Sequence, residues 1–157
     1  MHPLHRLVRH WRTPLVTGPA TFPPATLREI ENVIEVGKTM HRAHLHVAIE
    51  VKLPASAILR RESCRQRARR LFDAHRLWDI ENRSSLLIYL NLADRQVEIV
   101  ADHGVCNALT TAQWRDICQQ MSRGFAAGQF HAATLDGLKN LNHALQRELP
   151  HTRNNVD

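Results

Sequence analysis

Side chains that could carry acid–base or metal chemistry gather in two turn segments that flank the most apolar stretch of the chain. One segment is Asp102-His103-Gly104, and the other, residues 78–83, contains Asp79 and Asn82. Oxygen-rich clusters suit calcium or magnesium, whereas histidine beside carboxylate suits zinc and other transition metals. An acid next to a histidine could also serve metal-assisted hydrolysis of a phosphate ester.

The stretch between these segments predicts a β-hairpin. Residues 86–92 are apolar at nearly every position, which is typical of a strand covered on both faces. Residues 96–101 alternate between apolar and polar, which is typical of a half-exposed strand. Because only a short polar turn joins the two runs, we expect an antiparallel pair, with Asp94 and Arg95 shaping the turn.

The segments around the hairpin predict the rest of the fold. A strand at His44–Val51, a long helix at 56–77 and the central strand form a βαβ unit, so its two strands should be parallel. A helix from about 25 to 42 precedes this unit, and two helices follow the hairpin. We therefore predict an α/β three-layer sandwich. Its small mixed sheet, with one parallel pair plus an antiparallel hairpin strand in the order 1-2-3, is flanked by about four helices.

This topology brings the exit of the third strand beside the starts of the other two strands. The predicted ligands for a divalent cation, calcium or magnesium, at this loop edge are His44, Asp79, Asn82 and Asp102. Asp102 and His103 are the candidate catalytic residues. The structural alternative is that Asp79 caps a turn, Asn82 holds the loop and His103 is solvated. His44 and His46, two residues apart on one strand face, could chelate a metal but fit a packed position better.

No sharp catalytic motif accompanies these residues. The chain lacks a His-Glu-x-x-His spacing, a phosphate-cradling glycine loop and a Gly-x-Ser-x-Gly elbow. We therefore favour a non-catalytic binding or accessory module over an enzyme. A metal-assisted phosphatase acting on phosphate monoesters is the alternative.

Arginines crowd the predicted helix at 56–77 and are the strongest binding feature. The six candidates for contact with an anionic partner are Arg60, Arg61, Arg65, Arg67, Arg69 and Arg70. They could simply form a solvated face, or bind an acidic protein, an anionic membrane surface or nucleic acid. Nucleic acid is the less favoured partner, because aromatic residues make up only 5% of the chain and base stacking is poorly supplied.

Composition limits the class of protein further. The chain has 157 residues, a formal net charge of +6 and 43% hydrophobic residues, which suits one domain with a single core. We divide it into a basic N-terminal arm at 1–24, the α/β domain at 25–150 and a tail at 151–157. The arm could pack Trp11 on the domain, bind a membrane surface or partner, or contact nucleic acid. We identify no signal peptide or membrane span and expect a cytoplasmic protein, with peripheral membrane association left open. The sequence does not indicate an oligomeric state.

From about residue 25 to 149 the chain resembles the TPM-domain family. The resemblance rests on several short matches rather than on one signature. They are Leu71-Phe72 with Trp78-Asp79, the strand at 86–92, Asp94-Arg95, Glu98-Ile99-Val100, His103-Gly104-Val105, Phe125 with Gly128-Gln129-Phe130, and Gly137.

The resemblance implies a three-layer fold with helices on both faces of a small sheet. It also implies possible calcium binding, as in some relatives, or phosphatase activity, as described for a plant thylakoid relative. Two departures weaken the transfer of these activities. Asn82-Arg83-Ser84-Ser85 stands where the family has an Asp-Asn-Gly-like turn, and Asp102-His103-Gly104 stands where it tends to have Gly-Tyr-Gly.

Overall fold

Strand β2, Ser85–Asn91, forms the centre of the molecule, and all seven of its residues are buried. The structure is a computed structural model that describes residues 22–50 and 55–151. β2 pairs in parallel with β1, His44–Glu50, and antiparallel with β3, Gln96–Ala101. The strand order β1-β2-β3 confirms the sheet that the sequence predicts.

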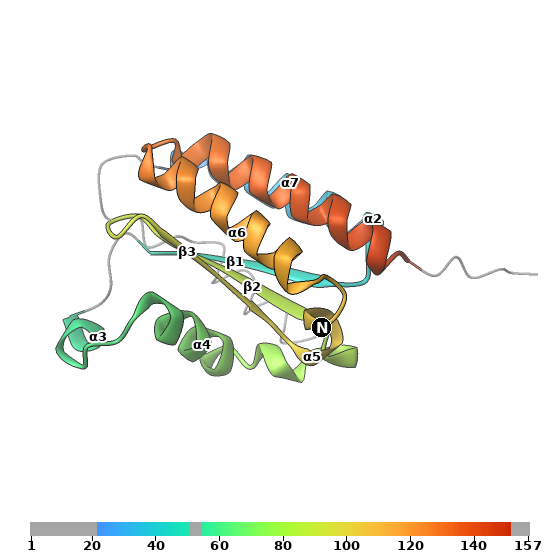
Figure 1. The fold of residues 1–157 in the computed structure, drawn as a ribbon, viewed down its shortest axis with the longest axis horizontal. Coiled ribbons are helices and arrows are strands. Elements are labelled where there is room, and N and C mark those ends of the chain that lie inside the picture. The colour runs from blue at the N-terminus through green and yellow to red at the C-terminus, as the bar shows by residue number, and fades with distance from the viewer. Residues whose placement is uncertain (1–21, 51–54, 152–157) are drawn as a thin grey trace, which may run out of the picture.

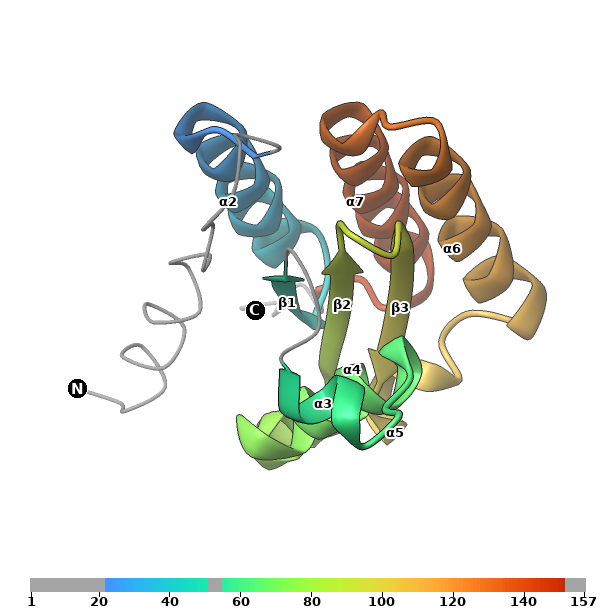
Figure 2. The same cartoon turned by 90° about the vertical axis from the view of Figure 1, so that its left-hand side faces the viewer.

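Helices cover both faces of this sheet (Figure 1). Helices α2 (Pro24–Met40), α6 (Thr111–Ala126) and α7 (Phe130–Glu148) lie on one side. Helix α4 (Cys64–Ala74) packs on the other side, and α3 (Ala55–Leu59) lies in the same layer (Figure 2). The predicted three-layer α/β sandwich is therefore confirmed.

The side chains of β2 divide between two cores. Leu86, Ile88 and Leu90 belong to the cluster beneath α2, α6 and α7. Leu87 and Tyr89, on the opposite face, belong to the cluster beneath α4. Because successive residues of a strand point to opposite faces, an apolar run without alternation is what a strand between two helical layers requires.

Helices α2 and α7 are joined by a buried polar pair. The His41 Nε2 atom, just after α2, lies 2.9 Å from the Asn142 Oδ1 atom of α7. The Asn142 Nδ2 group donates to the Val33 carbonyl oxygen at 2.9 Å. Gly37 allows this close approach, since a Cβ atom there would lie 2.4 Å from Oδ1 of Asn142. The pair thus fixes how α2 crosses α7 before the chain enters β1.

The prediction of one continuous helix over residues 56–77 is wrong. The chain forms α3 and α4 instead, and it turns between them at Arg61, which has a φ of 53°. Ser63 explains the restart, because its side chain accepts from the Gln66 amide while the Gln66 side chain accepts from the Ser63 amide. This reciprocal capping box satisfies two amides at the start of α4 and so favours a new helix there.

Two further segments have more helical structure than the sequence predicts. The loop before β2 contains the 3₁₀ turns η1, Leu77–Asp79, and η2, Glu81–Arg83. The exit of β3 leads directly into a one-turn helix, α5, His103–Cys106. With α3 and α4 counted separately, the described residues contain six α-helices rather than about four. The core reaches Phe22, which is 2% exposed, and α2 begins at Pro24. Residues 1–21 of the predicted arm lie outside the described residues, as does the tail beyond 151.

Candidate functional site

The loop edge that the sequence predicts is formed by the backbone of three segments. The His44 amide donates to the Ser84 carbonyl oxygen at 2.8 Å, which places the start of β1 beside the start of β2. A Cβ atom on Gly104 would lie 2.1 Å from the Asn82 carbonyl oxygen and 2.7 Å from that of Arg83. Only a residue without a side chain fits there, so Gly104 lets α5 pack directly against η2.

The carboxylates at this edge have different surroundings. Asp102 is 8% exposed, and its Oδ1 atom accepts from the His103 amide at 2.7 Å, which caps α5. Its Oδ2 atom is buried and has no hydrogen-bond partner among the described residues. Asp79, by contrast, is largely exposed and forms an ion pair of 3.5 Å with Arg76. Asp102 is therefore the better-shielded candidate ligand, and Asp79 is engaged at the surface.

The edge does not assemble a ready metal cage from side chains. His44 and Asn82 are exposed, and Arg83 brings a cation into the same turn. Across residues 22–50 and 55–151, no group of three or more His, Cys, Asp or Glu side chains is arranged to hold a metal ion. The oxygen donors present, the Asp102 carboxylate and the backbone oxygens of η2, are of the kind that calcium or magnesium prefers. The predicted cation site stays a hypothesis.

His46 lies on the same face of the sheet as the buried Tyr89, and its ring is largely shielded from solvent. Its Nε2 atom is buried without a partner in the described part of the chain. Burial lowers the pKa of His46 to about 4, and the positive charges of His44, Lys38 and His75 lower it further. The imidazole is therefore neutral at physiological pH and fits a packed position, as the sequence favours.

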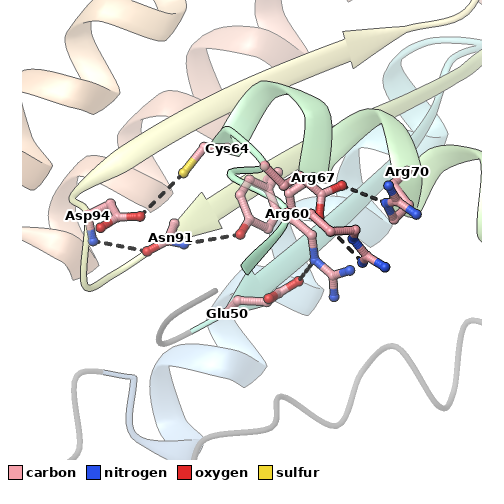
Figure 3. Close-up of polar contacts among 9 residues, drawn as sticks. Glu50, Arg60, Cys64, Arg67, Arg70, Asn91 and Asp94 are labelled. Atoms are coloured by element: carbon pink, nitrogen blue, oxygen red, sulfur yellow. Dashed lines mark hydrogen bonds and ion pairs between the residues drawn. The ribbon is translucent and has the colours of Figure 1, made fainter. Parts of the chain in front are cut away.

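At the opposite edge of the sheet, described residues form a hydrogen-bonded network (Figure 3). Asn91, fully buried, donates from Nδ2 to the Tyr89 hydroxyl at 3.1 Å and accepts from the Asp94 amide at 3.0 Å. Burial, with the adjacent Asp94 carboxylate, raises the pKa of the Cys64 thiol to about 11. A thiol held in its protonated form is a poor nucleophile. This network holds the hairpin turn against α4.

Two of the candidate arginines hold α4 on the sheet. Arg67 donates from Nε to Glu50 at 2.8 Å, and both side chains are mostly buried. Arg65 donates to the Ile99 carbonyl oxygen at 2.6 Å and lies 3.6 Å from Glu98. Because these contacts join α4 to β1 and β3, they hold the layer of α3 and α4 against the sheet.

Glu62 engages two more of the arginines. Its side chain is only 3% exposed, and it accepts from Arg70 at 2.6 Å and lies 4.0 Å from Arg60 (Figure 3). Both arginine side chains remain 53% exposed. One buried carboxylate thus shares its charge between two exposed guanidinium groups, which leaves this part of the surface positive.

Arg61 and Arg69 complete the set, and both are exposed. Neither side chain has an ion-pair or hydrogen-bond partner among the described residues. The outer surface of α4 and of the turn before it therefore carries a surplus of positive charge. We call Arg60, Arg61, Arg69 and Arg70 the arginine face.

Sequence reasoning missed two features of this layer. The first is the break before α4. Ser63 with Gln66 three residues later is a capping-box pattern, and it was the local signal for this break. The second is the exposure of Ile58 and Leu59 on α3, at 58% and 84%. Their signal in the sequence was their position directly before the exposed, arginine-rich segment that begins at Arg60.

Comparison with protein families identifies one match that covers most of the chain. The family model described as "TPM domain" matches residues 17–144. A comparison with curated proteins found no match. In the described residues no helix is both long and apolar enough to span a bilayer.

Solved structures share the fold at low sequence identity. The BA42 protein from Bizionia argentinensis has a TM-score of 0.73 at 18% identity, covering 86% of this chain and 88% of that chain. The N-terminal domain of a protein from P. gingivalis has a TM-score of 0.67 at 16% identity, covering 82% and 79%. The N-terminal domain of the cg2496 protein from Corynebacterium glutamicum has a TM-score of 0.60 at 10% identity, covering 85% and 87%. These likenesses concern the fold alone.

Proposed function

Since this chain belongs to the TPM-domain family, we propose that it is a non-catalytic binding module that presents the arginine face to an anionic partner. The observation that supports this proposal is that the four arginines of this face are exposed and have only one carboxylate partner among the described residues. Arg61 and Arg69 are exposed with no partner among the described residues, while Arg60 and Arg70 share the single carboxylate of Glu62. An uncompensated cluster of guanidinium groups attracts phosphate or carboxylate groups, and attracts them most strongly at low salt.

The packing of α4 supports a binding role for this face over a purely structural one. Arg67 and Arg65 already provide the contacts that hold the helix on the sheet. Arg70 and Arg60 neutralise the buried Glu62 carboxylate. The Arg61 and Arg69 side chains, by contrast, make no polar contact with the described residues that holds the fold. Arg69 lies on α4, whose buried side includes Ala68 and Phe72. The Arg61 and Arg69 side chains can therefore bind an external anion without disturbing the fold.

We predict that the Arg61→Gln/Arg69→Gln variant binds heparin about thirtyfold more weakly than the wild type at low ionic strength, since each of the two arginines contributes about 1 kcal/mol near an anionic surface. Heparin serves as a generic polyanion, and retention is measured by elution salt and by titration. The matched control is Arg115→Gln/Arg123→Gln, which removes the same charge from exposed positions on α6.

A variant with the opposite sign sharpens this test. Glu62→Gln removes the buried negative charge while keeping an oxygen that can accept from Arg70, so it should strengthen heparin binding. Equal weakening by the α4 and α6 pairs would mean that only net charge matters. That result, or no retention of the wild type at low salt, would contradict the proposed arginine face.

A second candidate function uses the loop edge, and the buried, unpartnered Oδ2 atom of Asp102 favours it. Here Asp102 would hold a divalent cation, with His44, Asp79 and Asn82 as the other predicted ligands, and His103 would serve as general acid or base. A bound calcium or magnesium ion would polarise a phosphoryl oxygen, so phosphate monoester hydrolysis is the activity to assay.

We expect calcium or magnesium at millimolar concentration to raise the melting temperature of the wild type but not of Asp102→Asn. The Asn variant keeps an oxygen to accept from the His103 amide, so the cap of α5 is preserved. The measurement is thermal unfolding with calcium, magnesium, manganese or zinc, followed by turnover of p-nitrophenyl phosphate. Equal shifts in both proteins, or none in either, would remove this candidate.

A further inference from the structure

Exposed apolar side chains are concentrated in the layer that carries the arginine face. The described residues expose four large hydrophobic side chains, and three of them lie in the segment from α3 to η1. Ile58 is 58% exposed, Leu59 84% and Trp78 40%, while the fourth, Val36, lies on α2 in the opposite layer. Single exposed apolar residues are ordinary, but Ile58 and Leu59 are adjacent and directly precede two exposed arginines, Arg60 and Arg61, which marks this end of the layer as an interaction surface.

Ile58 and Leu59 are the last two residues of α3, and the turn after them fixes the end of this helix. Ala57 is fully buried, and its carbonyl oxygen accepts from the Glu62 amide at 2.9 Å. The same turn places Arg60 and Arg61 directly after the apolar pair. α3 is therefore anchored by one small residue while its larger side chains face away from the core.

At the other end of the layer, Trp78 is also an exposed apolar side chain beside an arginine. The Arg76 guanidinium lies 5.3 Å from the centre of the Trp78 ring, a cation–π contact at a partly exposed position. Tryptophan and arginine are the side chains that suit the headgroup region of a bilayer, where one part of the side chain is apolar and the other is wet.

We propose that this layer docks on an anionic lipid bilayer, with Ile58, Leu59 and Trp78 entering the boundary between headgroups and acyl chains. Arg61 and Arg69 would then contact lipid phosphates. The inference rests on the proposed function and names its partner. Charge complementarity supports the arginine contacts, and the apolar tip selects a bilayer, because neither a polyanionic polysaccharide nor a nucleic-acid backbone offers an apolar phase for two aliphatic side chains.

The test is flotation of the full chain with vesicles of phosphatidylcholine alone or mixed with phosphatidylglycerol. We expect binding to the mixed vesicles only, and at least about tenfold weaker binding by Ile58→Ser/Leu59→Ser, because the apolar contribution is lost. Heparin retention of this variant should stay at the wild-type value. Val36→Ser is the matched control, since it removes an exposed aliphatic side chain from the other layer and should leave vesicle binding unchanged.

The outcomes separate this inference from the proposed function. Heparin retention by the wild type without vesicle binding would overturn the bilayer as partner and leave the arginine face standing. Equal vesicle binding by the wild type and Ile58→Ser/Leu59→Ser, or equal binding to both vesicle types, would also overturn the inference. Tighter binding to duplex DNA or RNA than to mixed vesicles at the same salt would assign a different partner. If the wild type bound neither heparin nor vesicles, both proposals would be wrong.

Discussion

We expect Asn142→Ala to lower the free energy of unfolding by about 3 kcal/mol, a large share of the stability of a domain of this size. Asn142 of α7 is 3% exposed, and its side-chain amide bonds both to the His41 ring and to the Val33 carbonyl oxygen of α2. Its loss leaves the His41 ring and the Val33 carbonyl oxygen without this partner in a buried position. Urea denaturation at pH 7 measures the change. Asn140→Ala, which removes an exposed amide of the same helix, should cost less than about 0.5 kcal/mol.

A double-mutant cycle with Gly37 tests the mechanism of this effect. In the wild type, Gly37→Ala should destabilise the protein, because the new Cβ atom would overlap the Asn142 amide at 2.4 Å. In the Asn142→Ala background the same substitution should stabilise α2 by about 0.5–1 kcal/mol, since alanine is the better helix former. Additive effects of the two substitutions would show that the packing of Asn142 against Gly37 is not what sets the cost.

The second large effect is a loss of stability in acid that comes from His46. The folded state holds the pKa of His46 at about 4, below the value near 6.5 of an exposed histidine. The neutral ring is thus favoured by folding. Its contribution is complete above pH 6.5, falls as the pH drops towards 4, and is lost below that value. We expect the stability of the wild type relative to His46→Met to fall by about 3 kcal/mol between pH 7 and pH 4.

Urea denaturation of both proteins across this pH range isolates the effect of His46 from that of the carboxylates, which titrate in both. His143, an exposed histidine on α7, offers the control: His143→Met should follow the wild type in parallel. Parallel curves for the wild type and His46→Met would show that burial of His46 does not set the acid sensitivity.

The sheet was the part of the fold most open to prediction, and the reason is local. The short apolar run at 86–92 is typical of a strand that is covered on both faces, and its side chains divide between two cores. The connection to β3 is too short for any pairing but a hairpin. The crossover from β1 through a helix required a parallel pair, as observed. Periodicity and connection length act within a few residues, so a single sequence reports them directly.

The loop edge was predictable as a place but not as a chemical site. The strand order alone brings the exit of β3 beside the start of β2, and Gly104 does lie against Asn82. The state of each carboxylate could not be predicted, because it depends on depth. Asp102 is buried as a helix cap, whereas Asp79, of the same residue type, lies at the surface with Arg76.

By itself the sequence determined the strands, their order, the family and the surplus of basic residues, because these follow from pattern, connection length and composition. Only the tertiary structure decided which arginines are available. Arg67 meets Glu50 and Arg65 meets Ile99 across 17 and 34 positions, while Glu62 turns inward to engage two more. Ion pairs and burial depend on side chains that meet only after folding. The charges left over, and the apolar side chains left exposed beside them, are therefore properties of the fold.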